Sequence, residues 1–101
     1  MSTVNLKFDS RRVMFYELGL YIKRLLKYSG ISLRQLCKRI HISSKTYEVL
    51  ITGVELRLSM YMRVIWGLLP EYAVEEHEKI VRNFYLFCLK GMMRGMIIGY
   101  Y

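Results

Sequence analysis

A chain of 101 residues can form one domain with a modest hydrophobic core, but it is too short for an enzyme built around a large cleft. Its 53% hydrophobic residues exclude intrinsic disorder. The net charge of +8 resides entirely in residues 1–70, which hold 12 basic and 4 acidic residues, and this indicates a polyanionic partner, either nucleic acid or an anionic membrane surface.

The N-terminal third of the chain predicts one helix preceded by a loose arm. Residues 1–10 are expected to form the arm, because they show no sustained apolar period. Residues 11–28 place apolar side chains on one stripe at helical spacing: Met14, Leu18, Ile22, Leu25 and Leu26. Ser29 and Gly30 then end this helix in the usual way.

A second, shorter helix begins after Ser32. Ser32 followed by Gln35 fits a capping box, in which the serine oxygen accepts a bond from an otherwise unpaired backbone amide. The inward face has Leu33, Leu36, Cys37 and Ile40. The outward positions are expected to carry Arg34, Lys38 and Arg39.

A three-residue break over residues 41–43 separates this helix from a third one. Ser43 is a good N-cap, and Gly53 supplies the left-handed conformation that ends many helices. Tyr47 and Leu50 are expected to point toward the core. The outward side of this short helix carries Ser44, Lys45, Glu48 and Val49.

The remaining segments are also helical by their apolar spacing. A fourth helix is expected to start at a Ser59 cap and to bury Tyr61, Val64 and Leu68. Pro70 suits the first turn of a fifth helix, whose opening contains several glutamates near the positive end of the helix dipole. No segment before residue 90 favours a strand over a helix, so the sequence predicts an all-α fold.

Residues 22–69 resemble the phage repressor and Cro family of helix-turn-helix DNA-binding domains. The resemblance rests on "GISLRQLCKRIHIS" for the second helix and turn, on "SKTYEVLITG" for the recognition helix and on "YMRVIWGLL" for the fourth helix. It implies a compact, lambda-repressor-like bundle of about five helices, with the third helix in the DNA major groove. Residues 11–70 would then be the DNA-binding domain, and residues 71–101 a C-terminal helix with a dimerisation tail.

The resemblance also assigns contact roles. Short polar side chains near the start of the third helix suit base edges, so the predicted base contacts are Ser44, Lys45, Glu48 and Val49. The predicted phosphate contacts are Ser32, Arg34, Lys38, Arg39, Ser43 and Arg57. The alternative is a solvated face on which Glu48 pairs with a nearby cation. The chain departs from the family pattern at Leu33, where a Gln is usual, and at His41, where a Gly is usual.

The C-terminal tail carries an apolar stripe that a monomer of this size would not leave exposed. A two-fold dimer would bury it, so the predicted dimerisation residues are Val81, Phe84, Cys88 and Met92. The same stripe could instead join the monomer core or touch a membrane. A spanning helix is disfavoured because Lys90 and Arg94 would each cost about 3 kcal/mol. The three glycines of the tail leave helix and edge strand both open.

These patterns predict a dimeric, sequence-specific regulator that binds double-stranded DNA in the cytoplasm, on the nucleoid. The alternative is a protein-interaction module of antitoxin or adaptor type, with the tail binding a partner. A membrane-surface protein is a third possibility. We expect neither an enzyme nor a cofactor, since no nucleophile, base and carboxylate recur at a catalytic spacing. The Cys37, His41, His77 and Cys88 spacing does not match a familiar metal site.

Overall fold

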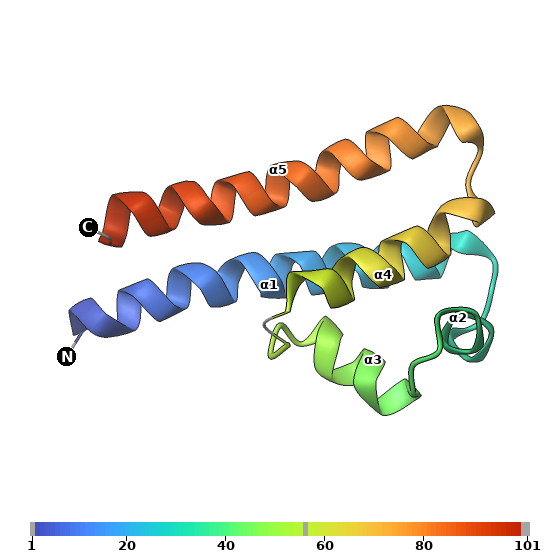
Figure 1. The fold of residues 1–101 in the computed structure, drawn as a ribbon, viewed down its shortest axis with the longest axis horizontal. Helices are drawn as coiled ribbons and strands as arrows, with labels where there is room; N and C mark the ends of the chain where they lie inside the picture. The colour runs from blue at the N-terminus through green and yellow to red at the C-terminus, as the bar shows by residue number, and fades with distance from the viewer. Residues whose placement is uncertain (1, 56, 100–101) are drawn as a thin grey trace.

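Two long helices, α1 (Ser2–Ser29) and α5 (Val74–Gly99), run antiparallel along each other and give the protein its length (Figure 1). This computed structural model describes the backbone of residues 2–55 and 57–99 and the side chains of residues 13–55 and 57–90. The segments between the long helices are α2 (Leu33–Ile40), α3 (Ser44–Ile51), α4 (Leu58–Leu68) and the 3₁₀ turn η1 (Leu69–Glu71). The predicted all-α fold of about five helices is confirmed.

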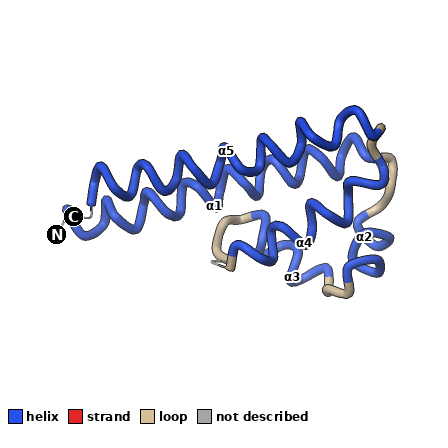
Figure 2. The backbone as a smooth tube through the Cα atoms, turned by 45° about the horizontal axis from the view of Figure 1, so that its top comes forward, coloured by secondary structure: helices blue, strands red, loops and turns tan. Residues whose placement is uncertain are grey.

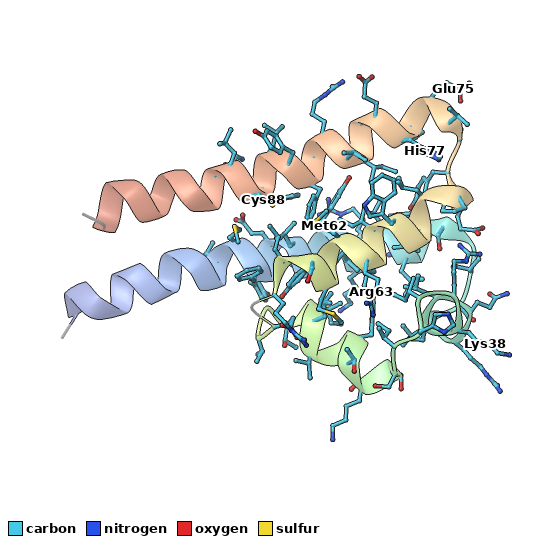
Figure 3. All side chains as sticks on the ribbon, viewed as in Figure 1. Lys38, Met62, Arg63, Glu75, His77 and Cys88 are labelled. Atoms are coloured by element: carbon cyan, nitrogen blue, oxygen red, sulfur yellow. The ribbon has the colours of Figure 1, made fainter. Side chains whose placement is uncertain are left out.

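The helices form three layers. α1 and α4 lie in the middle, α5 covers one side of α1, and α2 and α3 lie on the opposite side (Figures 1 and 2). Lys38 on α2 and Glu75 at the start of α5 therefore point away from each other at opposite sides of the protein (Figure 3). This arrangement separates the basic α2–α3 side from the glutamate-rich start of α5.

The core lies where α1, α2, α3 and α4 meet. Leu18 and Ile22 are completely buried because they are four residues apart on the inward face of α1. Their fully buried partners on the other helices are Leu36, Leu50, Tyr61, Val64 and Leu68. The rings of Phe15 and Tyr61 stack with their centroids 5.1 Å apart, which fixes α4 against α1.

Glycine at two helix crossings allows close contact. A Cβ added to Gly19 would lie 2.8 Å from the Cα of Ile51, so the end of α3 rests directly on the backbone of α1. A Cβ added to Gly67 would collide with a methyl group of Ile40, so α2 lies equally close to α4. The close packing of α3 on α1 and of α2 on α4 therefore requires glycine at positions 19 and 67.

Three boundaries differ from the predictions. The arm predicted over residues 1–10 is wrong, because α1 already begins at Ser2 and its first turns lie alongside the end of α5 (Figure 1). The cap of α4 is Arg57, whose side chain makes no capping bond, and Ser59 lies inside the helix. Pro70 lies in η1, and α5 begins four residues after it.

The tail is helical through Gly99, so the choice that the sequence left open between helix and strand is settled for residues 91–99. Glu75 and Glu76 lie in the first turn of α5, as predicted, where they stabilise the positive end of the helix dipole. Within the described residues, no helix has the length and apolar character needed to cross a membrane.

Candidate nucleic-acid interface

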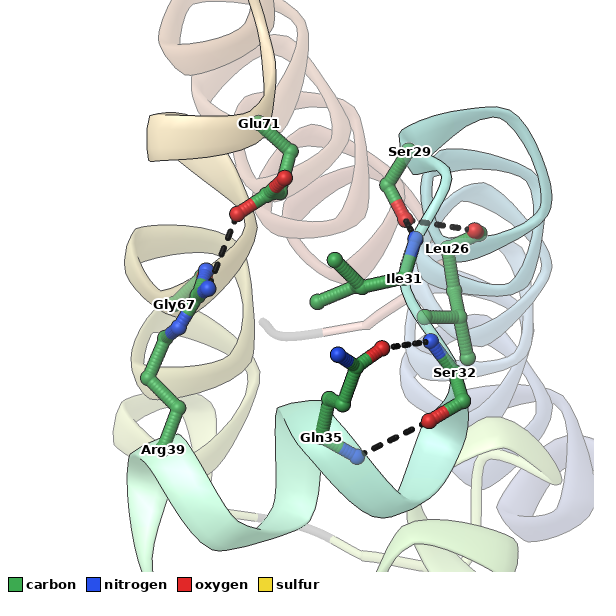
Figure 4. Close-up of polar contacts among 8 residues, drawn as sticks. All are labelled: Leu26, Ser29, Ile31, Ser32, Gln35, Arg39, Gly67 and Glu71. Atoms are coloured by element: carbon green, nitrogen blue, oxygen red, sulfur yellow. Dashed lines mark hydrogen bonds and ion pairs between the residues drawn. The ribbon is translucent and has the colours of Figure 1, made fainter.

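The first part of the interface is the start of α2, which is fixed by the predicted capping box. The Oγ atom of Ser32 accepts a bond from the Gln35 amide at 3.1 Å, and the Gln35 side chain accepts one from the Ser32 amide at 2.8 Å (Figure 4). Both side chains are exposed, but their oxygen atoms already take part in the cap. Ser32 therefore serves first as a structural residue.

The turn between α2 and α3 depends on His41. This residue is in the left-handed conformation, with φ of 59° and ψ of 50°, and among the described residues it is the one non-glycine residue with positive φ. The amide of Ile42 donates to the Cys37 carbonyl at 3.1 Å and closes the end of α2. The chain thus places a histidine where glycine would be free of strain.

α3 presents the predicted face to solvent. Ser43 caps the helix, with its Oγ accepting from the Thr46 amide at 3.0 Å, while Tyr47 and Leu50 are buried. The exposed residues include all four predicted base contacts, namely Ser44, Lys45, Glu48 and Val49. Within the described part of the chain Glu48 makes no ion pair, so the predicted alternative of a paired Glu48 is not observed.

The predicted phosphate-binding cations divide into two groups. Arg34 and Lys38 are exposed, make no ion pair with a described residue and lie on α2, Arg34 near its start and Lys38 near its end. Lys38 extends away from the protein at the outer edge of α2 (Figure 3). Together with Lys45 on α3, these two side chains give the α2–α3 side three cations that form no ion pair with a described residue.

Arg39 is exposed, as predicted for the outward side of α2, but its guanidinium is already paired within the chain. Its guanidinium donates to the Gly67 carbonyl at 2.7 Å and to the Glu71 carboxylate at 2.8 Å (Figure 4). These bonds tie α2 to the end of α4 and to η1. A residue that appeared to be one more surface cation at helical spacing is a tertiary bridge.

Arg57 also forms an ion pair within the chain, with Glu55. Its Nε and Nη2 atoms donate to the two carboxylate oxygens of Glu55 at 2.9 and 3.1 Å, and its amide donates to the same carboxylate at 2.8 Å. These hydrogen bonds raise the pKa of Arg57. The Tyr61 hydroxyl donates to the Glu55 carbonyl at 2.7 Å, so the loop after α3 is held on both sides.

The predicted dimerisation stripe on α5 is only partly on the surface. Phe84 and Cys88 are half-buried and pack against the core, because they lie on the side of α5 that faces α1. Val81 is exposed, and the side chain of Met92 lies outside the described residues. Further along α5, Tyr85, Leu86 and Leu89 are also exposed apolar side chains.

A second exposed apolar pair lies on α4. Trp66 is 60% exposed and Met62 is 41% exposed, and they are one helical turn apart. The signal was present in the sequence, since both residues fall on the side of the helix opposite Tyr61 and Val64.

Both cysteines are free thiols. Cys37 is buried and Cys88 half-buried, and burial raises the pKa of both thiols. The described side chains bring no three His, Cys, Asp or Glu residues together as a metal site.

Comparisons of the chain with protein-family models, with curated proteins and with solved structures found no match.

Proposed function

We propose that the protein binds double-stranded DNA as a transcriptional regulator, with α3 inserted in the major groove. One observation carries this proposal: α3 exposes Ser44, Lys45 and Glu48 near its start while its opposite side is buried in the core. A helix that reads base edges needs such a surface, because short polar groups can pair with the donors and acceptors on the groove floor.

Two cations on α2 suit the DNA backbone. Arg34 and Lys38 have no acidic partner among the described residues, so pairing with phosphates would break no existing ion pair. If both bind phosphates, the logarithm of the affinity should fall with the logarithm of the salt concentration at a slope of about −2. Arg39 and Arg57 should contribute little, since each would have to leave a carboxylate.

A gel shift with random and then genomic DNA at two salt concentrations tests the proposal. A specific site that survives the higher salt supports it, whereas loss of all binding at that salt contradicts it. Lys45→Ala should weaken specific binding about tenfold or more. Lys79→Ala is the matched control, because Lys79 is also exposed but lies on α5. An equal effect of the two substitutions would place the contact away from α3.

The proposal includes a two-fold dimer that covers the exposed apolar side chains of α5. A regulator of this kind would act in the cytoplasm, on the nucleoid. A second candidate is an adaptor or antitoxin-type interaction module, which the exposed Trp66 and Met62 on α4 favour. A gel shift without any specific site would favour this second candidate.

A further inference from the structure

An open groove runs between the outer side of α1 and the neighbouring side of α3. Its volume is about 560 Å³. The groove is lined by Leu20, Lys23, Arg24, Leu26, Lys27 and Tyr28 from α1, and by Tyr47 and Ile51 from α3. It adjoins the side of α3 that packs on α1, and the proposed base-reading residues do not line it.

The groove combines positive charge with hydrocarbon. Lys23, Arg24 and Lys27 are exposed on two successive turns of α1, and none of them is ion-paired within the described part of the chain. Leu20 is 40% exposed and Tyr28 is 68% exposed in the same groove. The Lys27 ammonium lies 5.5 Å from the centre of the Tyr28 ring, so charge and aromatic surface are in direct contact.

This combination favours a protein segment over nucleic acid. Phosphates would pair with the three cations but would leave Leu20 and Tyr28 in contact with water, since a DNA backbone offers little apolar surface at that point. A peptide with carboxylates beside aliphatic or aromatic side chains would satisfy both kinds of surface at once. The exposed apolar residues therefore decide between the two classes of ligand.

We propose that this groove binds an acidic amphipathic peptide segment of another protein. Its apolar side chains would pack on Leu20 and Ile51, and its carboxylates would pair with Lys23, Arg24 and Lys27. This site lies beside the proposed DNA-reading face and does not depend on it. The protein would then have one surface for DNA and another for a protein partner.

The experiment titrates isotope-labelled full-length protein with three short acidic peptides of one composition. The first places its apolar residues at helical spacing, the second alternates them as in a strand, and the third has a scrambled order. One of the two patterned peptides should bind at least about tenfold more tightly than the scrambled one. The amide signals of Leu20, Lys23 and Ile51 should shift most. Equal binding of all three peptides, or no binding, overturns the proposal.

Charge reversal locates the site. Lys23→Glu combined with Lys27→Glu should weaken the patterned peptide about tenfold or more, and Leu20→Ser should weaken it as well. All three positions are exposed, so circular dichroism should show an unchanged helical fold. Lys79→Glu on α5 is the matched control and should leave peptide binding unchanged. An equal loss in the control overturns the proposal.

A duplex DNA titration separates the two ligand classes. The Lys23→Glu and Lys27→Glu double variant should lose peptide binding while keeping most of its affinity for duplex DNA. If it loses affinity for DNA and keeps its affinity for the peptide, the groove is a nucleic-acid contact and the proposal is wrong. Because the peptide titration contains no DNA, failure of the proposed DNA binding would not affect its result.

Discussion

Arg39 and Glu71 are 32 residues apart in the chain, and their side chains meet at 2.8 Å. The same guanidinium also bonds to the carbonyl of Gly67, the residue whose missing side chain lets α2 approach α4. Arg39 thus links α2 to the end of α4 and to η1. The orientation of the proposed DNA-reading helix depends on this bridge as well as on the core.

Arg39→Ala should therefore reduce the free energy of unfolding by about 1–2 kcal/mol, because the Gly67 carbonyl and Glu71 both lose a charged donor. Arg39→Lys should recover part of this loss, since an ammonium cannot span both acceptors as a guanidinium does. Urea unfolding followed by circular dichroism measures both effects. The salt dependence of DNA binding should stay the same in Arg39→Ala, and a slope shallower by about 1 would show that Arg39 does bind phosphate.

Gly19→Ala should destabilise the protein although it lies inside a helix. Alanine gains about 1 kcal/mol in helix propensity, but its methyl group would meet the backbone of Ile51, which cannot rotate away as a side chain can. We expect a net loss of about 1–2 kcal/mol and weaker DNA binding, because α3 must move away from α1. Lys23→Ala, at an exposed position of α1, is the control; a Gly19→Ala variant as stable as this control would contradict the close contact.

His41 should tolerate glycine better than any branched residue. His41→Gly relieves the left-handed strain and should leave stability unchanged or raise it by up to about 1 kcal/mol. His41→Val should lower it by about 1–2 kcal/mol, since a β-branched side chain fits that conformation poorly. Thermal unfolding should give a higher midpoint for His41→Gly than for His41→Val. Equal midpoints would argue against the left-handed conformation of residue 41.

The protein should lose stability above about pH 10. Burial, and then the negative charge of Glu55, raise the pKa of Tyr61 above its usual value of 10.0, and burial also raises the pKa of Tyr47. The unfolded chain releases these protons near pH 10 whereas the folded chain keeps them, so the stability that is present below pH 10 declines as the pH rises beyond it.

Urea midpoints across this pH range measure the decline, and Tyr61→Phe should show a smaller one. At neutral pH the same variant should be about 1 kcal/mol less stable, because the Glu55 carbonyl loses the bond from the Tyr61 hydroxyl. An alkaline decline of the same size in Tyr61→Phe and in the unsubstituted protein would assign the effect to other groups.

The proposed dimer should dissociate when charge is placed on the exposed side of α5. Tyr85→Glu combined with Leu89→Glu should give a monomer by light scattering, with the helical content unchanged, because both side chains point away from the core. Val74→Glu is a suitable control, since Val74 is the most exposed of the large hydrophobic residues and lies at the start of α5. A protein that is monomeric before any substitution would remove the dimer from the proposal.

Local signals in the sequence predicted the α2–α3 unit well. The Ser32 and Gln35 capping box, the Ser43 cap and the positive φ of Gly53 are all present, because each depends on residues within about four positions. The inward positions of Tyr47 and Leu50 follow from helical period, which is also local. The predicted contact residues on α3 are exposed for the same reason.

Contacts between residues far apart in the chain could not be predicted from the sequence. Nothing near Arg39 or Glu71 indicates that they meet, so a bridging arginine looked like a surface cation. On α5 apolar residues occur on more than one side, and the period alone could not show that Phe84 faces α1 while Tyr85 faces solvent. The start of α1 was missed because residues 2–10 lack a clear apolar stripe, yet α5 runs alongside them.

The contact between Gly19 and Ile51 has a mechanical consequence. Backbone rests on backbone at that point, so α3 has no room to move closer to α1 at this crossing. α1 extends well past the three-helix globule beside α5 (Figure 2). A shift of α1 toward α3 at this crossing would therefore have to displace the short helix as well.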